Sequence, residues 1–243
     1  MAIAFDSSTA GAGPATNGTS LSVSVTAPTG SNVLMVVGFR ILRSIEPTGS
    51  ATYGGVAMTK ISVTETTIGS AQWVELWYLL APASGSNTLT RTAQGLPTQS
   101  QIHAYTVAFY TGVAQSSQPN ASNSGRQAGG DFTIAATSTV DNCWLIGDAH
   151  ETQGSGGAGT TARSGVNSLF ICDKNGPTTP AGSATLIFDE QLGGNTAANV
   201  AMFAPAVASG PANLKSLDTN LKANIKSYNT NVLANIKSIN TNA

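Results

Sequence analysis

The sequence predicts an all-β protein, an antiparallel β-sandwich or jelly roll. Short segments alternate apolar and polar residues, as in Ser20–Ala27, where Leu21, Val23 and Val25 occupy one face with serines between them. Stretches rich in Gly, Pro, Asn and Ser separate these segments, and no helical period of apolar residues lies between them. Roughly a dozen strands at this spacing are typical of a sandwich or jelly roll.

The expected strands follow one another along the chain. Asn32–Phe39 is apolar on both faces, so it should lie inside a sheet that is covered on both sides. Gly54 and Gly55, between Tyr53 and Val56, predict a two-residue hairpin turn. The remaining expected strands are Ala71–Leu80, Ser86–Ala93, Gln101–Val113, Asp131–Thr137, Asn142–His150, Ser168–Asp173, Ser183–Glu190 and Ala198–Val207.

The composition excludes some partners. Charged residues make up 9% of the chain, against about 25% in a typical soluble domain, so Ser, Thr, Asn, Gln and Gly should cover the surface. The net charge of -1, with no basic cluster among aromatic residues, argues against nucleic acid as a partner. The first twenty residues have no signal-peptide pattern, and the apolar runs are too short to span a membrane. A surface with so little charge is typical of a protein that works outside a cell, yet no export signal is present. A virion protein, which is assembled in the host cytoplasm and released by lysis, would satisfy both observations, and we expect one here. Cys143 and Cys172 form no disulfide framework, and two buried thiols are favoured over a bond.

The chain is expected to contain one domain and a repetitive tail. Residues 1–207 should form the β-sandwich, 208–212 a linker rich in Pro and Gly, and 213–243 a tail with an 11-residue repeat. The apolar positions of the tail are Leu214, Leu217, Leu221, Ile225, Tyr228, Val232, Ile236 and Ile239.

Two structures are open for this tail. On a helix the apolar residues form one stripe, and an 11-residue repeat predicts a right-handed supercoil with partner helices. The many Asn, Thr and Ser residues favour instead short strands joined by turns. In either form one chain cannot bury the stripe, so we expect the tail to mediate homo-oligomerisation, with a trimer favoured, or to anchor the protein. A disordered polar tail is the alternative.

No residue set in the sequence predicts a catalytic site, a metal site or a bound cofactor. His150 shares a strand face with Asp148, and His103 is the other histidine, but further ligands at suitable spacing are missing. Asp189 and Glu190 are adjacent, so on a strand they point to opposite faces and cannot act as a carboxylate pair. We therefore expect the protein not to be an enzyme.

The strand Ala71–Leu80 contains a candidate ligand site. Trp73, Glu75 and Trp77 occupy one of its faces, and the two indole rings, about 13 Å apart on a strand, flank a carboxylate. Such a face would suit the stacking of sugar rings and predicts a carbohydrate-binding module for host or environmental glycans. The structural alternative is a central strand whose second face is covered by the other sheet or by a neighbouring subunit.

Several segments share their overall pattern with a group of known proteins: MAIAFDSSTAG, TGSNVLMVVGF, TYGGVAMTKI, VELWYLLAPASGSNTLT and, in the tail, NIKSINTN. With these segments, which cover much of residues 1–115 and the tail, the chain resembles poorly characterised structural proteins of tailed bacteriophages. In that group the tail repeats commonly carry Asn-Gly where this chain has Asn229-Thr230 and Asn240-Thr241, which is a weaker turn signal.

The resemblance implies a non-enzymatic virion component, either a capsid decoration protein or a fibre-like part of the head or tail. It also implies partners such as the major capsid protein, and it brings no catalytic residues. The carbohydrate-binding module is the alternative function. A glycan hydrolase is least favoured, because no expected strand offers several acidic residues on one face.

Overall fold

The described part of the chain consists of strands and connecting loops. The computed structural model describes residues 1–13, 20–43, 45–66, 72–94, 101–150, 155–189 and 195–207. Among these residues it contains seventeen strands, all paired antiparallel, and no helix, so none of the described segments is a helix of the length and hydrophobicity needed to cross a bilayer. The contacts divide the chain into Met1–Ala206 and Val207–Ala243. The predicted linker, the tail and its eight apolar positions lie outside the described residues.

The strands form four sheets, which we number I to IV. Sheet I has the order β2 (Ser20–Ala27), β8 (Gly85–Gln94), β4 (Thr48–Tyr53) and β5 (Val56–Ala57). Sheet II has the order β1 (Ala4–Ala12), β9 (Gln101–Thr111), β3 (Leu34–Leu42), β7 (Gln72–Leu80) and β6 (Thr59–Glu65). Sheet III has the order β10 (Ala121–Ala128), β17 (Asn195–Phe203), β12 (Trp144–His150), β15 (Leu169–Asp173) and β14 (Thr161–Val166). Sheet IV has the order β11 (Phe132–Thr137), β16 (Ser183–Asp189) and β13 (Ser155–Gly156).

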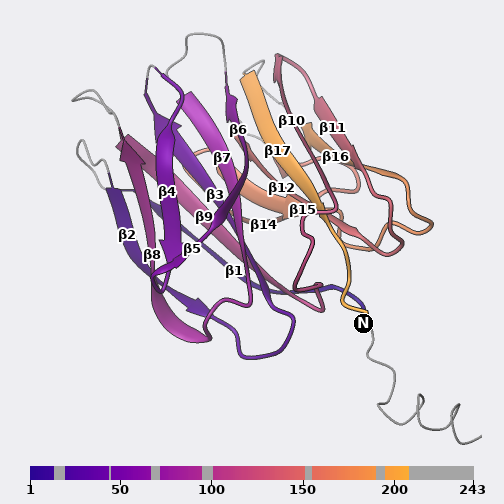
Figure 1. Cartoon of the computed structure of the whole chain (residues 1–243). Coiled ribbons are helices and arrows are strands. Elements are labelled where there is room, and N and C mark those ends of the chain that lie inside the picture. Colours follow the sequence, from indigo (N-terminus) through magenta and orange to yellow (C-terminus); the bar gives the residue numbers. More distant parts are fainter. Residues whose placement is uncertain are drawn as a thin grey trace, which may run out of the picture. The chain divides into compact units, whose positions relative to one another are not determined.

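These sheets are stacked in the order I, II, III, IV (Figure 1). The central strand β3 shows why: Met35 and Val37 pack into the core between sheets I and II, whereas Leu34 and Val36 pack into the core between sheets II and III. A third core, which includes Leu145 of β12 and residues of β11, β16 and β17, lies between sheets III and IV. Because successive strand residues point to opposite faces, a strand apolar at every position suits an inner layer.

The four sheets are two jelly rolls with the same topology. Sheets I and II contain β1 to β9, which we call the N-lobe, and sheets III and IV contain β10 to β17, which we call the C-lobe. The order β1-β9-β3-β7-β6 with β2-β8-β4 in the N-lobe matches the order β10-β17-β12-β15-β14 with β11-β16-β13 in the C-lobe. In each lobe the larger sheet interleaves early and late strands, as two Greek keys do in a jelly roll.

The lobes pack face to face through sheets II and III, and the contacts are reciprocal. β1 contacts β14 as β10 contacts β6, and β9 contacts β15 as β17 contacts β7. Asn32 and Asn142, which occupy the same place before β3 and β12, both adopt a left-handed backbone, with φ of 59° and 63°. A reciprocal interface of this kind has local two-fold symmetry, like that of a homodimer, but here it lies within one chain.

The predicted fold class is confirmed, with one correction. The chain is an all-β, antiparallel sandwich protein with jelly-roll strand order, but roughly a dozen strands were expected in one sandwich, and the described residues form seventeen strands in two. The predicted hairpin is present, since Gly54 and Gly55 have φ of 56° and 81° and join β4 to β5. The segment expected inside a sheet is β3, which lies between β9 and β7.

Candidate functional site

A buried polar cluster lies in the interface between the lobes. Asp148 and Asn199 are directly paired in sheet III, as Gly38 and Thr106 are in sheet II, and Gly38 faces the Asp148 side chain across the interface. Asn199 Nδ2 donates to Asp148 Oδ1 at 2.9 Å, and Thr64 Oγ1 donates to Asn199 Oδ1 at 2.8 Å. Asp148, Asn199 and Thr106 are each 0% exposed.

The Asp148 carboxyl is unusual because only one of its oxygens is satisfied. Burial raises the pKa of Asp148 to about 7, the negative charge of Glu75 adds to this increase, and the hydrogen bond from Asn199 opposes it. Within the described part of the chain, Asp148 Oδ2 and Thr106 Oγ1 have no hydrogen-bond partner. The carboxyl is therefore a neutral acid below pH 7, and ionising it would place an incompletely solvated charge between the lobes.

A second polar contact joins the lobes near their edge. Tyr110 of β9 donates to Asp173 Oδ2 of β15 at 2.7 Å. Arg163 donates two hydrogen bonds to the same carboxylate, from Nε to Oδ2 at 2.7 Å and from Nη2 to Oδ1 at 2.9 Å. The Arg163 guanidinium lies 4.2 Å from the centre of the Phe5 ring. Burial and the neighbouring Asp173 raise the pKa of Tyr110 well above its ordinary value, so its hydroxyl stays a donor. This arrangement fastens β9 of the N-lobe to the C-lobe.

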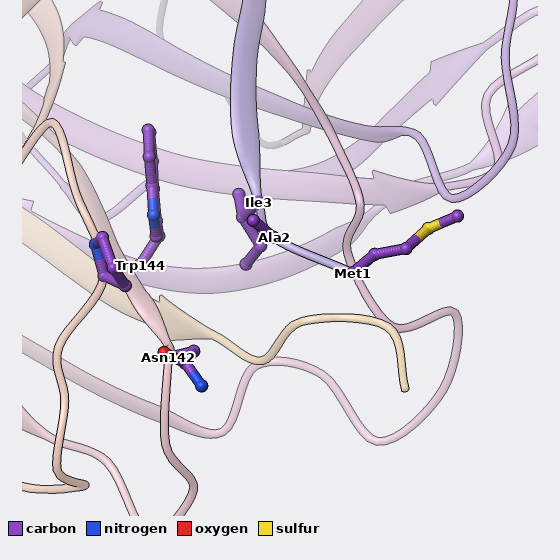
Figure 2. Close-up of a pocket in the computed structure, with 6 residues that line it drawn as sticks. Met1, Ala2, Ile3, Asn142 and Trp144 are labelled. Carbon is purple, nitrogen blue, oxygen red and sulfur yellow. The ribbon is translucent and has the colours of Figure 1, made fainter. Parts of the chain in front are cut away.

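The described surface has a cavity of about 400 Å³ beside the start of β1 and the start of β12 (Figure 2). Trp144 is 7% exposed, and its ring meets Tyr110 edge to face with 5.9 Å between centroids. Asn142 holds the loop at the rim, where its Oδ1 accepts a 2.6 Å hydrogen bond from Thr179. Among the described residues that line this cavity, no side chain is an acid or a base. Its lining residues are Met1, Ala2, Ile3, Asn142, Trp144 and Pro177.

The predicted glycan platform on β7 is wrong for two of its three residues. Glu75 is 0% exposed and Trp77 is 4% exposed, because sheet I covers this face of β7. Glu75 is bound by Arg91 through Nε at 2.7 Å and Nη2 at 2.8 Å, and by Lys60 Nζ at 3.0 Å. Trp77 Nε1 donates to Glu75 Oε2 at 3.0 Å, and Trp73, near the start of β7, is only partly buried. The structural alternative, a strand covered on its second face by the other sheet, describes this part of the molecule.

The structure also places most of the other residues that were considered from the sequence. Asp148 and His150 share a face of β12 as expected, and both are buried in the interface, 0% and 7% exposed. Among the described residues, no group of three or more His, Cys, Asp or Glu side chains could hold a metal ion. Cys143 and Cys172 are buried thiols that form no disulfide bond, as predicted. Glu190 lies outside the described residues.

Sequence reasoning did not single out the residues that join the lobes, such as Asn199, Tyr110 and Asp173. A buried polar residue in an otherwise apolar strand is a usable signal, and "ANVAMF" around Asn199 and "LFICD" before Asp173 both carry it. Neither segment shows from sequence which residue lies opposite. The partners become visible only once sheets II and III are placed together.

These features define the class as an all-β protein made of two jelly rolls packed face to face by their larger sheets. The chain matches no protein-family model, and comparisons with curated proteins and with solved structures gave no match.

Proposed function

We propose that the chain is a non-enzymatic structural protein of a bacteriophage virion, either a capsid decoration protein or a fibre-like component of the head or tail. The doubled jelly roll is the observation that carries this proposal, because jelly rolls recur in viral capsid and lectin domains. The phage assignment itself comes from the resemblance of much of residues 1–115 and of the tail to structural proteins of tailed bacteriophages. The support from fold is by analogy, since one fold serves many functions.

The outer face of sheet I also supports a structural role. It carries no charged side chain on its two longest strands, and the Ser24 and Ser86 hydroxyls bond each other at 2.7 Å. Short hydroxyl side chains lose little conformational entropy on contact, so such a face can pack against a neighbour at small cost. The face consists of Ser20, Ser22, Ser24 and Thr26 on β2, opposite Thr92, Thr90, Thr88 and Ser86 on β8.

Several buried charges of the molecule serve internal contacts. Glu75 and Arg91 form an ion pair inside the N-lobe, and Asp173 and Arg163 help to join the lobes. Such pairs fix the geometry of a rigid unit. A unit of fixed geometry with an uncharged outer face on sheet I suits display in many copies, where many weak contacts on a symmetric particle add up to firm attachment.

The test is to locate the protein in purified particles of the phage that encodes it. Quantitative mass spectrometry gives the copy number, and immunogold labelling gives the position. Hundreds of copies on the shell would identify a decoration protein, and a few copies at one vertex would identify a fibre or tail part. Absence from particles that are otherwise complete would refute the proposal.

A glycan array probed with the full chain addresses the carbohydrate-binding alternative. We expect no binding above background. Specific binding that is lost in Trp73→Ala would favour the glycan module, since Trp73 is the one predicted platform residue whose side chain is not buried.

A further inference from the structure

The buried carboxyl of Asp148 lies across the lobe interface from a glycine, and this glycine holds the corresponding position in the other lobe. By strand register, Asp148 in the C-lobe corresponds to Gly38 in the N-lobe, and Asn199 corresponds to Thr106. A Cβ atom at Gly38 would lie 2.8 Å from Thr106 Oγ1 and 3.0 Å from Asp148 Oδ2. The carboxyl therefore occupies the space that the glycine leaves open, in the middle of the lobe interface.

We propose that the Asp148 carboxyl is a proton-operated clamp between the two lobes. As the neutral acid it lets sheets II and III close on each other. When it loses its proton, an unpaired negative charge lies between the sheets and the interface loosens.

The groups that face this carboxyl do not neutralise it. On sheet II it meets Gly38 and Thr106, and on sheet III it meets Asn199, whose Nδ2 is shared between Asp148 Oδ1 and the carbonyl oxygen of Val74. Asp148 Oδ2 accepts no hydrogen bond from any of the described residues. An uncharged amide and hydroxyl stabilise a carboxylic acid better than they stabilise a carboxylate in a low dielectric.

The nearby charges on the packed strands also fail to offset a carboxylate. Arg40, two residues beyond Gly38 on β3, donates to the carbonyl oxygen of Asn167 and to Gln72 Oε1. Glu75 on β7 adds negative charge from the other side of sheet II and so raises the Asp148 pKa. The other titratable group on this face of β12 is His150, which is 7% exposed.

The direction of the pH effect follows from the raised pKa of about 7, against 3.8 for an ordinary aspartate. The folded protein keeps this proton over a pH range in which the unfolded chain has lost it. Stability from this group is therefore full below about pH 4 and is lost as the pH rises towards 7. The equilibrium constant for unfolding should rise by about tenfold per pH unit within this window and level off above it.

The experiment compares the full-length protein with Asp148→Asn, which keeps the shape and removes the proton. Denaturant unfolding is measured between about pH 5 and 8, together with hydrogen exchange of β3 and β12, corrected for the intrinsic effect of pH. We expect the wild type to lose stability and protection in β3 and β12 as the pH rises, and Asp148→Asn to lack this component. Asp131→Asn, the same change at an exposed position, should keep the wild-type profile.

Identical pH profiles of the wild type and Asp148→Asn would overturn the proposal. If Asp148→Asn does not fold, the wild type labelled with ¹³C at the aspartate carboxyl carbons gives the answer by NMR. One carboxyl should then titrate near pH 7, and titration of every aspartate below pH 5 would equally overturn the clamp.

Discussion

At the scale of single residues, Glu75 and Arg91 form an ion pair, and both residues are fully buried in the N-lobe core. The C-lobe has a different kind of residue at the position that corresponds to Arg91. The motif Gly-Ser-x-Thr-Leu occurs at Gly85–Leu89 and again at Gly182–Leu186, and two residues beyond it Arg91 corresponds to Phe188. A jelly roll of this topology therefore accepts an apolar side chain where the N-lobe has a guanidinium, and the ion pair is one solution among others.

Arg91→Met should destabilise the protein by about 3–5 kcal/mol, because among the described residues it leaves the buried Glu75 side chain with only Lys60 and Trp77 as side-chain partners. Denaturant unfolding at neutral pH measures this change. Arg126→Met is the matched control, because the Arg126–Glu65 pair is partly exposed, with side chains 39% and 17% accessible, and should contribute less than about 1 kcal/mol.

The double variant Glu75→Leu, Arg91→Met separates two explanations. If the loss in Arg91→Met comes from the uncompensated Glu75 charge, removing that charge should recover most of the stability. If the double variant is as unstable as the sum of the single variants, packing of the Arg91 side chain, and not charge, explains the loss.

At the scale of strands, the sequence predicts which segments are strands and where a hairpin turns, but not which sheet covers each strand face. Alternation and apolar runs predict β3 as a covered strand, and Gly54-Gly55 predict a hairpin, because both signals are local to the backbone. The platform on β7 failed because alternation shows that Trp77 and Glu75 share a face but not which sheet covers it. The two lobes share the motif Gly-Ser-x-Thr-Leu, yet corresponding interface positions carry different residues, as Gly38 and Asp148 show.

β3 packs closely against the C-lobe because residue 38 is a glycine and has no Cβ atom. Gly38→Ala would place a Cβ atom against Thr106 Oγ1 and Asp148, in an interface with no room for it, and should destabilise the protein by about 1–3 kcal/mol. Thermal unfolding checks this, with hydrogen exchange in β3 and β12 as the local readout. Gly176→Ala is the control, because its Cβ would meet no atom within 4 Å and should change the stability by less than about 0.5 kcal/mol. Equal effects of the two substitutions would mean that the lobe interface is not tightly packed at Gly38.

At the scale of the whole molecule, the two lobes reproduce a dimer interface within one chain, so this face of each lobe is already occupied. The ends of the described unit are held by backbone contacts: the Met1 amino group donates to the Ala206 carbonyl oxygen at 2.7 Å, and the Ala206 amide donates to Gly112 at 2.7 Å. A chain that ends at Val207 retains these contacts. Further assembly must therefore use another surface, either an outer face or the tail predicted from the sequence.

Deleting residues 208–243 distinguishes these two surfaces. We expect the shortened protein to keep the circular dichroism spectrum and melting temperature of the β fold and to become monomeric in analytical ultracentrifugation, because the sequence predicts that the apolar positions of the tail are buried against sister copies. In the full-length chain, Ile225→Asn with Ile236→Asn should have the same effect on mass, whereas Lys226→Asn with Lys237→Asn, which lie off the stripe, should leave the oligomer intact. An oligomer of unchanged size after the deletion would place the assembly contacts on the lobes and remove the role we expect for the tail.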